Sequence, residues 1–336
     1  MKKLISILLA VAMLAVFTAC GTVNKTEVSV LWSGDGVVKV PNSLINAVER
    51  AMYIENISYA HYGANGSQET QTQQARAALD KGCAALMVEL VDVAAAQQIV
   101  DAAKAKSVPV VFFNCNVEKA VCDSYDKCAV VSTDAATLPA VYGKLVGDYV
   151  IKNFDKLDRN KDGAISYFPA GEVAETAAKV NEALTAKGKA KLAPNVSEII
   201  SDVTSCINAG VQDGKENDMV ELILADSDEL ALEALTALQA LDYNTTKLVT
   251  HCIPVFAVGA DADAVAFTDT STMKEEDLKV FIFNATNLVD AGKLAGTVVE
   301  DYDAIAVGAA ELLAKLLKGK KPASNTVLAP YTTYAG

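Results

Sequence analysis

The chain has 336 residues, of which 51% are hydrophobic, and a formal net charge of −13 at pH 7. The negative charge argues against nucleic acid or an anionic membrane surface as a partner, because both repel an acidic protein. The length is sufficient for two domains of ordinary size.

The N-terminus has the pattern of a secretory signal peptide. A short basic start precedes the apolar stretch Leu4–Phe17, and Thr18-Ala19-Cys20 then places small residues before a cysteine. The apolar stretch is too short for a spanning helix. A cysteine at this point resembles a bacterial lipobox, so we expect removal of residues 1–19 and a lipid on the sulfur of Cys20. The alternative is an ordinary signal peptide with an incidental cysteine. The polar residues 20–27 are expected to form a tether.

The first half of the mature chain alternates β-rich runs with amphipathic stretches, which is typical of βαβ units on a buried parallel sheet. The expected strands are Val28–Trp32, Ile57–Tyr62, Ala84–Leu90 and Val108–Asn114. The expected helices are Asn42–Glu55, Gln68–Lys81 and Ala94–Lys106.

The pattern resumes in the second half. The expected helices are Leu138–Asn153, Glu172–Lys187, Asp228–Leu241 and Ala304–Lys318, and the expected strands are Val220–Asp226, Pro254–Val258 and Val280–Asn284. We therefore predict an α/β protein of two doubly wound parallel-sheet lobes with a hinge. The predicted N-terminal lobe is 28–133 plus 286–318, and the C-terminal lobe is 134–285 plus 319–336. Ligands of such sheets bind beyond the carboxyl ends of the strands, so a cleft between the lobes is the expected site.

Six cysteines occur besides Cys20, and an even number permits disulfides in an exported protein. They are Cys83, Cys115, Cys122, Cys128, Cys206 and Cys252. Cys115, Cys122 and Cys128 are close in sequence, but their pairing is left open. The chain has no CxxC spacing and two histidines, which argues against a zinc cluster.

The segment 158–166 has the pattern of the first half of a calcium loop, with oxygen-bearing side chains at positions 1, 3 and 5 and a glycine at position 6. The candidate ligands are Asp158, Asn160, Asp162, the backbone carbonyl of Ala164, and Ser166. Position 12 is Pro169, which cannot supply a carboxylate, and 165–168 is expected to be a strand. The loop is therefore not an EF-hand, and a further carboxylate must come from elsewhere. The alternative is a polar turn that matches by chance.

Several segments together resemble the bacterial galactose/glucose-binding proteins, which are type I periplasmic binding proteins that serve ABC importers. The resemblance covers roughly 28–320. It is carried by Lys-Gly-Cys-Ala-Ala-Leu (81–86), Leu-Val-Asp-Val-Ala-Ala-Ala (90–96), Val-Pro-Val-Val-Phe-Phe-Asn (108–114), Asp-Ser-Tyr-Asp-Lys (123–127), the loop 158–163, Ile-Pro-Val-Phe (253–256) and Leu-Ala-Gly-Thr-Val (294–298).

The resemblance implies one further ligand for the calcium loop and a set of residues for a sugar site. For structural Ca²⁺ it supplies Glu221, at the start of a distant strand. For a sugar it implies carboxylates and amides that bond the hydroxyls, with rings stacked on the sugar faces. The matching or neighbouring positions are Asp35, Asn114, Glu172, Ser227, Asp261, Asn284 and Glu300. The arginine of the family falls near Thr176 and its stacking tryptophan near Cys206, so the identity of the sugar is open. Trp32 either stacks on a ligand or closes the core.

The signal sequence and the resemblance together predict an extracytoplasmic lipoprotein that binds a monosaccharide and delivers it to an ABC importer permease, with the membrane contacted through the lipid alone. The alternatives are a sensory module for a chemoreceptor or sensor kinase, and a binding protein for a non-hexose polar solute. An enzyme is not expected, because the chain has no GxSxG, no HExxH and no phosphate-binding glycine loop.

Overall fold

A computed structural model describes residues 27–34, 40–189, 191–194, 220–241, 243–244, 252–259 and 294–335. The predicted signal peptide and the predicted sites Cys20, Asp35, Asp261 and Asn284 lie outside the described residues. The chain divides into two compact units. The first comprises Met1–Val40, Val48–Val131 and Val307–Val327, and the second comprises Pro41–Ala47, Ser132–Ala306 and Leu328–Gly336.

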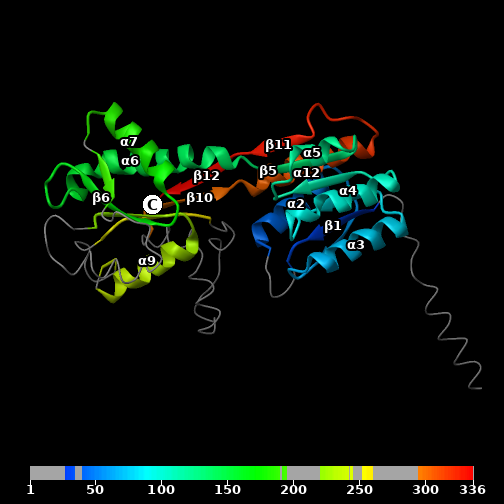
Figure 1. The fold of residues 1–336 in the computed structure, drawn as a ribbon, viewed down its shortest axis with the longest axis horizontal. Helices are drawn as coiled ribbons and strands as arrows, with labels where there is room; N and C mark the ends of the chain where they lie inside the picture. Colours follow the sequence, from blue (N-terminus) through cyan, green and yellow to red (C-terminus); the bar gives the residue numbers. More distant parts are fainter. Residues whose placement is uncertain are drawn as a thin grey trace, which may run out of the picture. The chain divides into compact units, whose positions relative to one another are not determined.

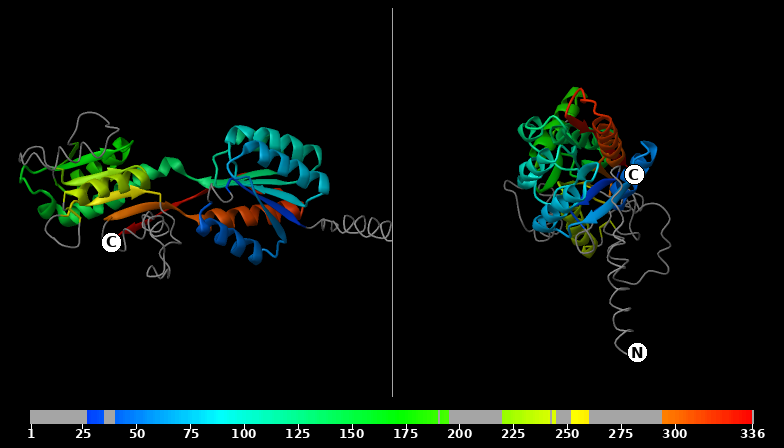
Figure 2. Two further views of the ribbon diagram at one scale, coloured as in Figure 1. Left: turned by 90° about the horizontal axis from the view of Figure 1, so that it is seen from below. Right: turned by 90° about the vertical axis from the view of Figure 1, so that its right-hand side faces the viewer.

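The first unit is built on a six-stranded sheet in the order β11-β5-β4-β3-β1-β2. Its strands are β1 Val28–Trp32, β2 Tyr59–Gly63, β3 Ala85–Val88, β4 Val110–Phe113, β5 Cys128–Thr133 and β11 Thr326–Ala329. The helices in this part of the chain are α2 Asn42–Ile54, α3 Gln68–Lys81, α4 Ala96–Ala105, α5 Lys119–Asp123 and α12 Tyr302–Leu317, with the 3-10 turn η1 Val93–Ala95 before α4. Figure 2 shows α3 and α4 on one face of the sheet and α2 and α12 on the other.

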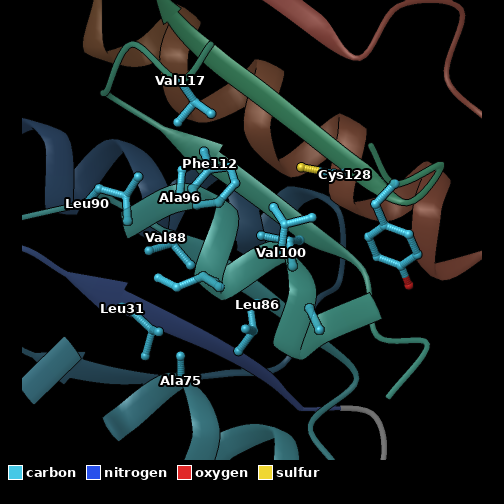
Figure 3. Packing of buried hydrophobic residues seen from close by; sticks show 14 of the residues in the cluster. Leu31, Ala75, Leu86, Val88, Leu90, Ala96, Val100, Phe112, Val117 and Cys128 are labelled. Carbon is cyan, nitrogen blue, oxygen red and sulfur yellow. The ribbon is translucent and has the colours of Figure 1, made fainter. Parts of the chain in front are cut away.

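The central strands β1, β3, β4 and β5 are buried on both faces of this sheet, which is why they are largely apolar, whereas the edge strands β2 and β11 are only partly buried. Leu86 and Val88 of β3 pack with α3 and α4 in one hydrophobic cluster (Figure 3), and Met87 between them is also fully buried. The helix α3 is bounded by local signals. Ser67 accepts a hydrogen bond from the Thr70 amide at its start, and Gly82 adopts φ 83° at its end.

The second unit has a sheet in the order β12-β10-β9-β8-β6-β7. Its strands are β6 Ile165–Ala170, β7 Leu192–Pro194, β8 Leu222–Ala225, β9 Val255–Val258, β10 Gly296–Glu300 and β12 Tyr331–Ala335. Its helices are α6 Leu138–Leu157, α7 Ala174–Ala186 and α9 Asp228–Ala240, with the turn η2 Ala135–Thr137 before α6. Figure 1 shows α6 and α7 on one side of the strands and α9 on the other.

The alternation of side chains along β8 separates two cores in this unit. Leu222 and Leu224 pack with α6 and α7, whereas Ile223 and Ala225 pack with α9. The two helices on the first face approach closely at Gly143, where a Cβ atom would lie 2.4 Å from Lys179 Cβ.

Both sheets have the same core order, β2-β1-β3-β4-β5 and β7-β6-β8-β9-β10, which is one of the common doubly wound arrangements. The predicted fold class, two parallel-sheet α/β lobes, is confirmed. The predicted division was wrong at the C-terminus. The range 286–318 was assigned to the first lobe, yet β10 lies in the second sheet. The range 319–336 was assigned to the second lobe, yet β11 lies in the first sheet. A short strand does not reveal its partner in its own sequence. None of the described helices is long and apolar enough to be a membrane span.

The contribution of the buried face of α4 to stability can be tested by replacing a buried and an exposed isoleucine, in turn, with alanine. Ile99 in α4 is 1% exposed, whereas Ile54 at the end of α2 is 73% exposed. Ile99→Ala leaves a cavity in the core and is expected to lower the free energy of unfolding by about 2–5 kcal/mol. Ile54→Ala should change it by less than about 0.5 kcal/mol. Urea denaturation of both variants measures the difference, and equal effects would contradict the packing described here.

Candidate functional site

Polar side chains follow three neighbouring strands of the first sheet. Ser33 follows β1, Glu89 follows β3 and Asn114 follows β4, and these strands are adjacent in the order β4-β3-β1. Because the strands are parallel, their carboxyl ends lie at the same edge of the sheet. This is the edge at which open α/β sheets bind ligands.

Glu89 is the centre of this cluster. Its side chain is 6% exposed. One carboxylate oxygen accepts a hydrogen bond from Asn114 Nδ2 at 2.8 Å, and the other accepts bonds from Ser33 Oγ at 2.9 Å and Ser33 N at 3.2 Å. Its backbone carbonyl accepts a bond from Nε2 of the buried Gln71 at 2.8 Å. A buried carboxylate must be satisfied by donors, and these bonds hold it in one position.

Asn114 is held in an orientation set by its backbone and by Glu89. It has φ 52°, in the left-handed region that asparagine tolerates better than most residues. Its backbone amide donates to Val131 O at 3.0 Å. An amide side chain has two N–H donors and one acceptor oxygen, so the one bond that Asn114 makes to Glu89 among the described residues leaves capacity for a ligand.

Trp32 belongs to the core of the first unit. The indole is 5% exposed, its Nε1 donates to His61 Nδ1 at 2.8 Å, and its ring meets Phe113 edge-on at a centroid distance of 5.2 Å. Of the two alternatives left open by the sequence, the structure supports closure of the core over stacking on a ligand.

The second sheet also ends in polar residues. After β6, Gly171 adopts φ 94°, and a Cβ there would lie 2.2 Å from the carboxylate of Asp226, which follows β8. Glycine at position 171 therefore permits the backbone amide of Glu172 to donate to Asp226 Oδ2 at 2.7 Å. The side chain of Glu172 is exposed at this edge.

Two further predicted ligand residues lie in the second unit. Ser227 is the N-cap of α9, and its side chain makes no capping hydrogen bond. Glu300 ends β10 and accepts a bond from Thr133 Oγ1 at 2.8 Å.

Asp228, the first residue of α9, is an ionisable group in a desolvated position. Its Oδ1 is buried and has no hydrogen-bond partner among the described residues. Burial raises the pKa of this carboxyl to about 8. Gly259, which follows β9, packs beside this carboxyl. It has φ 89°, and a Cβ built on it would lie 3.6 Å from Asp228 Oδ2, an ordinary contact distance. A protonated carboxyl can donate one hydrogen bond as well as accept them, so Asp228 could act as a donor to a ligand.

The predicted calcium loop joins α6 to β6, and Glu221 lies against it. Glu221 is 1% exposed, and burial raises its pKa. Its carboxylate accepts hydrogen bonds from the backbone amides of Arg159 at 2.7 Å, Asn160 at 3.4 Å and Ser166 at 3.0 Å. The structure thus brings a residue remote in sequence to the loop.

The side chains within the loop bond its own backbone. Asp162 Oδ1 accepts from Ala164 N at 2.7 Å, Asn160 Oδ1 accepts from Asp162 N at 3.1 Å, and Asp158 Oδ2 accepts from Gly163 N at 3.2 Å. Asp158 Oδ1 is buried and has no hydrogen-bond partner in the described part of the chain. As placed, no three His, Cys, Asp or Glu side chains of the described residues form a metal-binding group.

Four residues at the sheet edges were not predicted as site residues, namely Ser33, Glu89, Asp226 and Asp228. Glu89 lies within the run Leu-Met-Val-Glu-Leu-Val, which reads as core, although a single charge in such a run is itself a signal. Asp226 and Asp228 flank the predicted Ser227, and the acidic residues of a first helical turn are usually attributed to the helix dipole.

This chain is similar to known proteins along most of its length. A family model described as a periplasmic binding protein domain matches residues 32–321. The D-galactose/methyl-galactoside binding periplasmic protein of Haemophilus influenzae is 28% identical over 341 residues, which cover 97% of this chain and 92% of that protein.

Solved structures show the same fold. A solute binding protein of an ABC transporter from Actinobacillus succinogenes, with bound D-allose, has a TM-score of 0.60 at 13% identity, covering 92% of this chain and 97% of that one. The periplasmic ribose ABC transporter protein of Conexibacter woesei has a TM-score of 0.59 at 19% identity, covering 94% and 93%.

The raised pKa of Asp228 predicts a pH dependence of stability. Between the unfolded pKa near 4 and the folded pKa of about 8, the native state holds a proton that the unfolded state has lost. Stability from this group therefore falls as the pH rises across that window. We expect the difference in Tm between pH 5 and pH 8 to be smaller in Asp228→Asn than in the wild type. The exposed Asp155→Asn is the control. An unchanged pH dependence in Asp228→Asn would contradict the burial of this carboxyl.

Proposed function

This chain belongs to the periplasmic binding protein family, and on that premise we propose that it captures a sugar outside the cytoplasm and delivers it to an ABC importer. Binding proteins of this kind act by holding a solute and not by transforming it. The proposal assigns recognition of the ligand to the polar residues that follow the strands of each sheet.

The observation that carries the proposal is the Glu89–Asn114–Ser33 cluster. Its members come from three strand ends and are held by bonds of 2.8 to 3.2 Å. Sugar hydroxyls act as donor and acceptor at once, so they suit an amide and a carboxylate that are fixed side by side. Because Asn114 is oriented before any ligand arrives, little side-chain entropy is lost on binding.

The relative from Haemophilus influenzae supports a sugar as the ligand, since its name specifies D-galactose and methyl-galactoside binding. We propose a galactose- or glucose-like monosaccharide as the first candidate class. The galactose/glucose-binding proteins have an arginine that falls near Thr176 of this chain. Thr176 lies in α7 and is 5% exposed. The hydroxyls bonded by that arginine must therefore be recognised differently here, and a non-hexose polar solute is the alternative ligand.

We further propose that the mature protein begins at Cys20 and carries lipid there. The support is the signal sequence with a cysteine directly after small residues. Such an anchor would keep the binding protein beside its importer in the membrane.

We also propose that the loop binds structural Ca²⁺ through Asp158, Asn160, Asp162, the carbonyl of Ala164, Ser166 and Glu221. Two observations support this choice of ligands. Glu221 is a buried carboxylate beside the loop, and Asp158 Oδ1 is a buried oxygen that lacks a hydrogen-bond partner within the described residues. A divalent cation would compensate the unpartnered Asp158 oxygen and bind the Glu221 carboxylate, provided that Glu221 and the loop side chains exchange their present backbone bonds for the metal. The bound ion would tie the end of α6 to β6 and β8.

The role of Asn114 in binding can be tested by Asn114→Gly, since glycine keeps the left-handed backbone and removes the amide. We expect about a tenfold loss of affinity for D-galactose, or for the sugar that binds best in a panel, measured by calorimetry. The matched control is Asn56→Gly, because Asn56 is exposed, has φ 54° and precedes β2 at the opposite end of the sheet. Equal affinities of Asn114→Gly and wild type would remove Asn114 from the site.

The calcium proposal predicts a stability change on chelation. Removing an ion present at about a hundredfold over its Kd should lower Tm by several degrees. Asp162→Ala should abolish the sensitivity to chelator, whereas Asp155→Ala, at an exposed acidic residue outside the loop, should retain it. A wild-type melting curve unchanged by thorough chelation would contradict a calcium site.

A further inference from the structure

Two buried cysteines of the first unit are in contact. Cys122 in α5 is fully buried, and Cys128, the first residue of β5, is 1% exposed. Both belong to the hydrophobic cluster that contains α4, and Figure 3 shows Cys128 at its margin. Both side chains line one pocket, and a side-chain hydrogen bond between the two thiols shifts the pKa of each, so the sulfurs face each other.

The backbone between the cysteines is folded so that this contact is built in. The amide of Tyr125 donates to Cys122 O at 3.4 Å, and the amide of Cys128 donates to Tyr125 O at 3.0 Å. These two successive turns bring Cys128 back toward Cys122, with five residues between them. The ring of Tyr125 is 7% exposed, which holds the turn against the core.

A cavity of about 410 Å³ has both cysteines in its lining. The remaining walls come from Lys119, Asp123, Tyr125, Asp126 and the segment 321–325. The space beside the sulfurs permits the small movement that is needed to bring them from hydrogen-bond contact to bonding distance.

We propose that Cys122 and Cys128 form a disulfide bond in the exported protein. The inference goes beyond sugar binding and depends only on a location outside the cytoplasm, where thiols are oxidised. The oxidant is a disulfide, supplied by a thiol–disulfide oxidoreductase or a small-molecule disulfide. The Cys122 thiolate attacks one sulfur of that disulfide and releases the other as a thiol. Cys128 then loses its proton, attacks the Cys122 sulfur and releases the second thiol, so two protein thiols are oxidised and one disulfide is reduced.

Cys122 is better suited to act as the nucleophile than Cys83 and Cys115, two other thiols of the first unit. Its side-chain hydrogen bond with Cys128 lowers the pKa of its thiol. Burial instead raises the pKa of Cys83 to about 11 and that of Cys115 to about 12. Those two thiols therefore stay protonated at neutral pH and are poor competitors for the oxidant.

Trypsin can test the bond directly, because lysines separate the three candidates. Cys115 lies on peptide 107–119, Cys122 on 120–127 and Cys128 on 128–144. The full chain is exported from cells with its own signal sequence, alkylated under denaturing conditions without reductant, and digested. Mass spectrometry should find 120–127 linked to 128–144, and reductant should remove this species. Alkylated Cys122 and Cys128 on separate peptides, or 107–119 linked to either peptide, would overturn the proposal.

A second measurement checks that the bond supports the fold. Closing this short loop restricts the unfolded chain, so reductant should lower the wild-type Tm by about 5 °C. The Cys122→Ser/Cys128→Ser double variant should show no response to reductant, and Cys83→Ser should respond as the wild type does. If the double variant does not fold, the peptide map decides alone. Affinity for sugar is measured separately, so loss of this proposal leaves the binding proposal intact.

Discussion

Burial of both faces of a parallel sheet constrains the rest of this molecule. In β3 all four residues are fully buried, and the central strands of the second sheet are nearly as enclosed. A charged side chain within such a strand would lose its hydration without gaining enough partners. The polar residues inside the buried strands are small hydroxyls such as Ser29 and Thr297, and the Thr297 hydroxyl donates to Ala257 O. Larger polar and charged groups lie where strands end. Ser33, Glu89 and Asn114 occupy such positions in the first unit, and Asp226 does so in the second.

Three buried or partly buried carboxylates outside the strands show how a charged group is accommodated beside these sheets. Glu89 accepts three hydrogen bonds from side chains and backbone, and Glu221 accepts three from backbone amides. Asp228 has one oxygen without a partner in the described residues, and its pKa is raised to about 8. The same cost of burying charge is thus met by side-chain donors, by backbone donors, or by retaining the proton. Each arrangement leaves a different capacity for a ligand or a cation.

The sequence predicted well what depends on local periodicity. The strand Val28–Trp32 and the helix Gln68–Lys81 were predicted with the bounds that the structure has. The contact of Glu221 with the loop was anticipated through the resemblance, as was the position of Asn114. Properties that depend on distant partners were not predictable in the same way. The sheet to which β10 and β11 belong is decided by neighbours far along the chain. Glu89 was missed because an isolated charge in an apolar run gives no indication of the donors around it, and Trp32 stayed ambiguous until His61 and Phe113 were placed beside it.

The central claim is that the strand-end residues bind a sugar, and the most direct test is to identify the solute that the protein itself retains. Protein purified from its native envelope without added ligand would be exchanged into a volatile buffer and denatured, and the released small molecules would be identified by mass spectrometry. The account predicts a monosaccharide in near-stoichiometric amount from the wild type and less of it from a variant that lacks the Asn114 amide. A stoichiometric solute that is not a carbohydrate would contradict it.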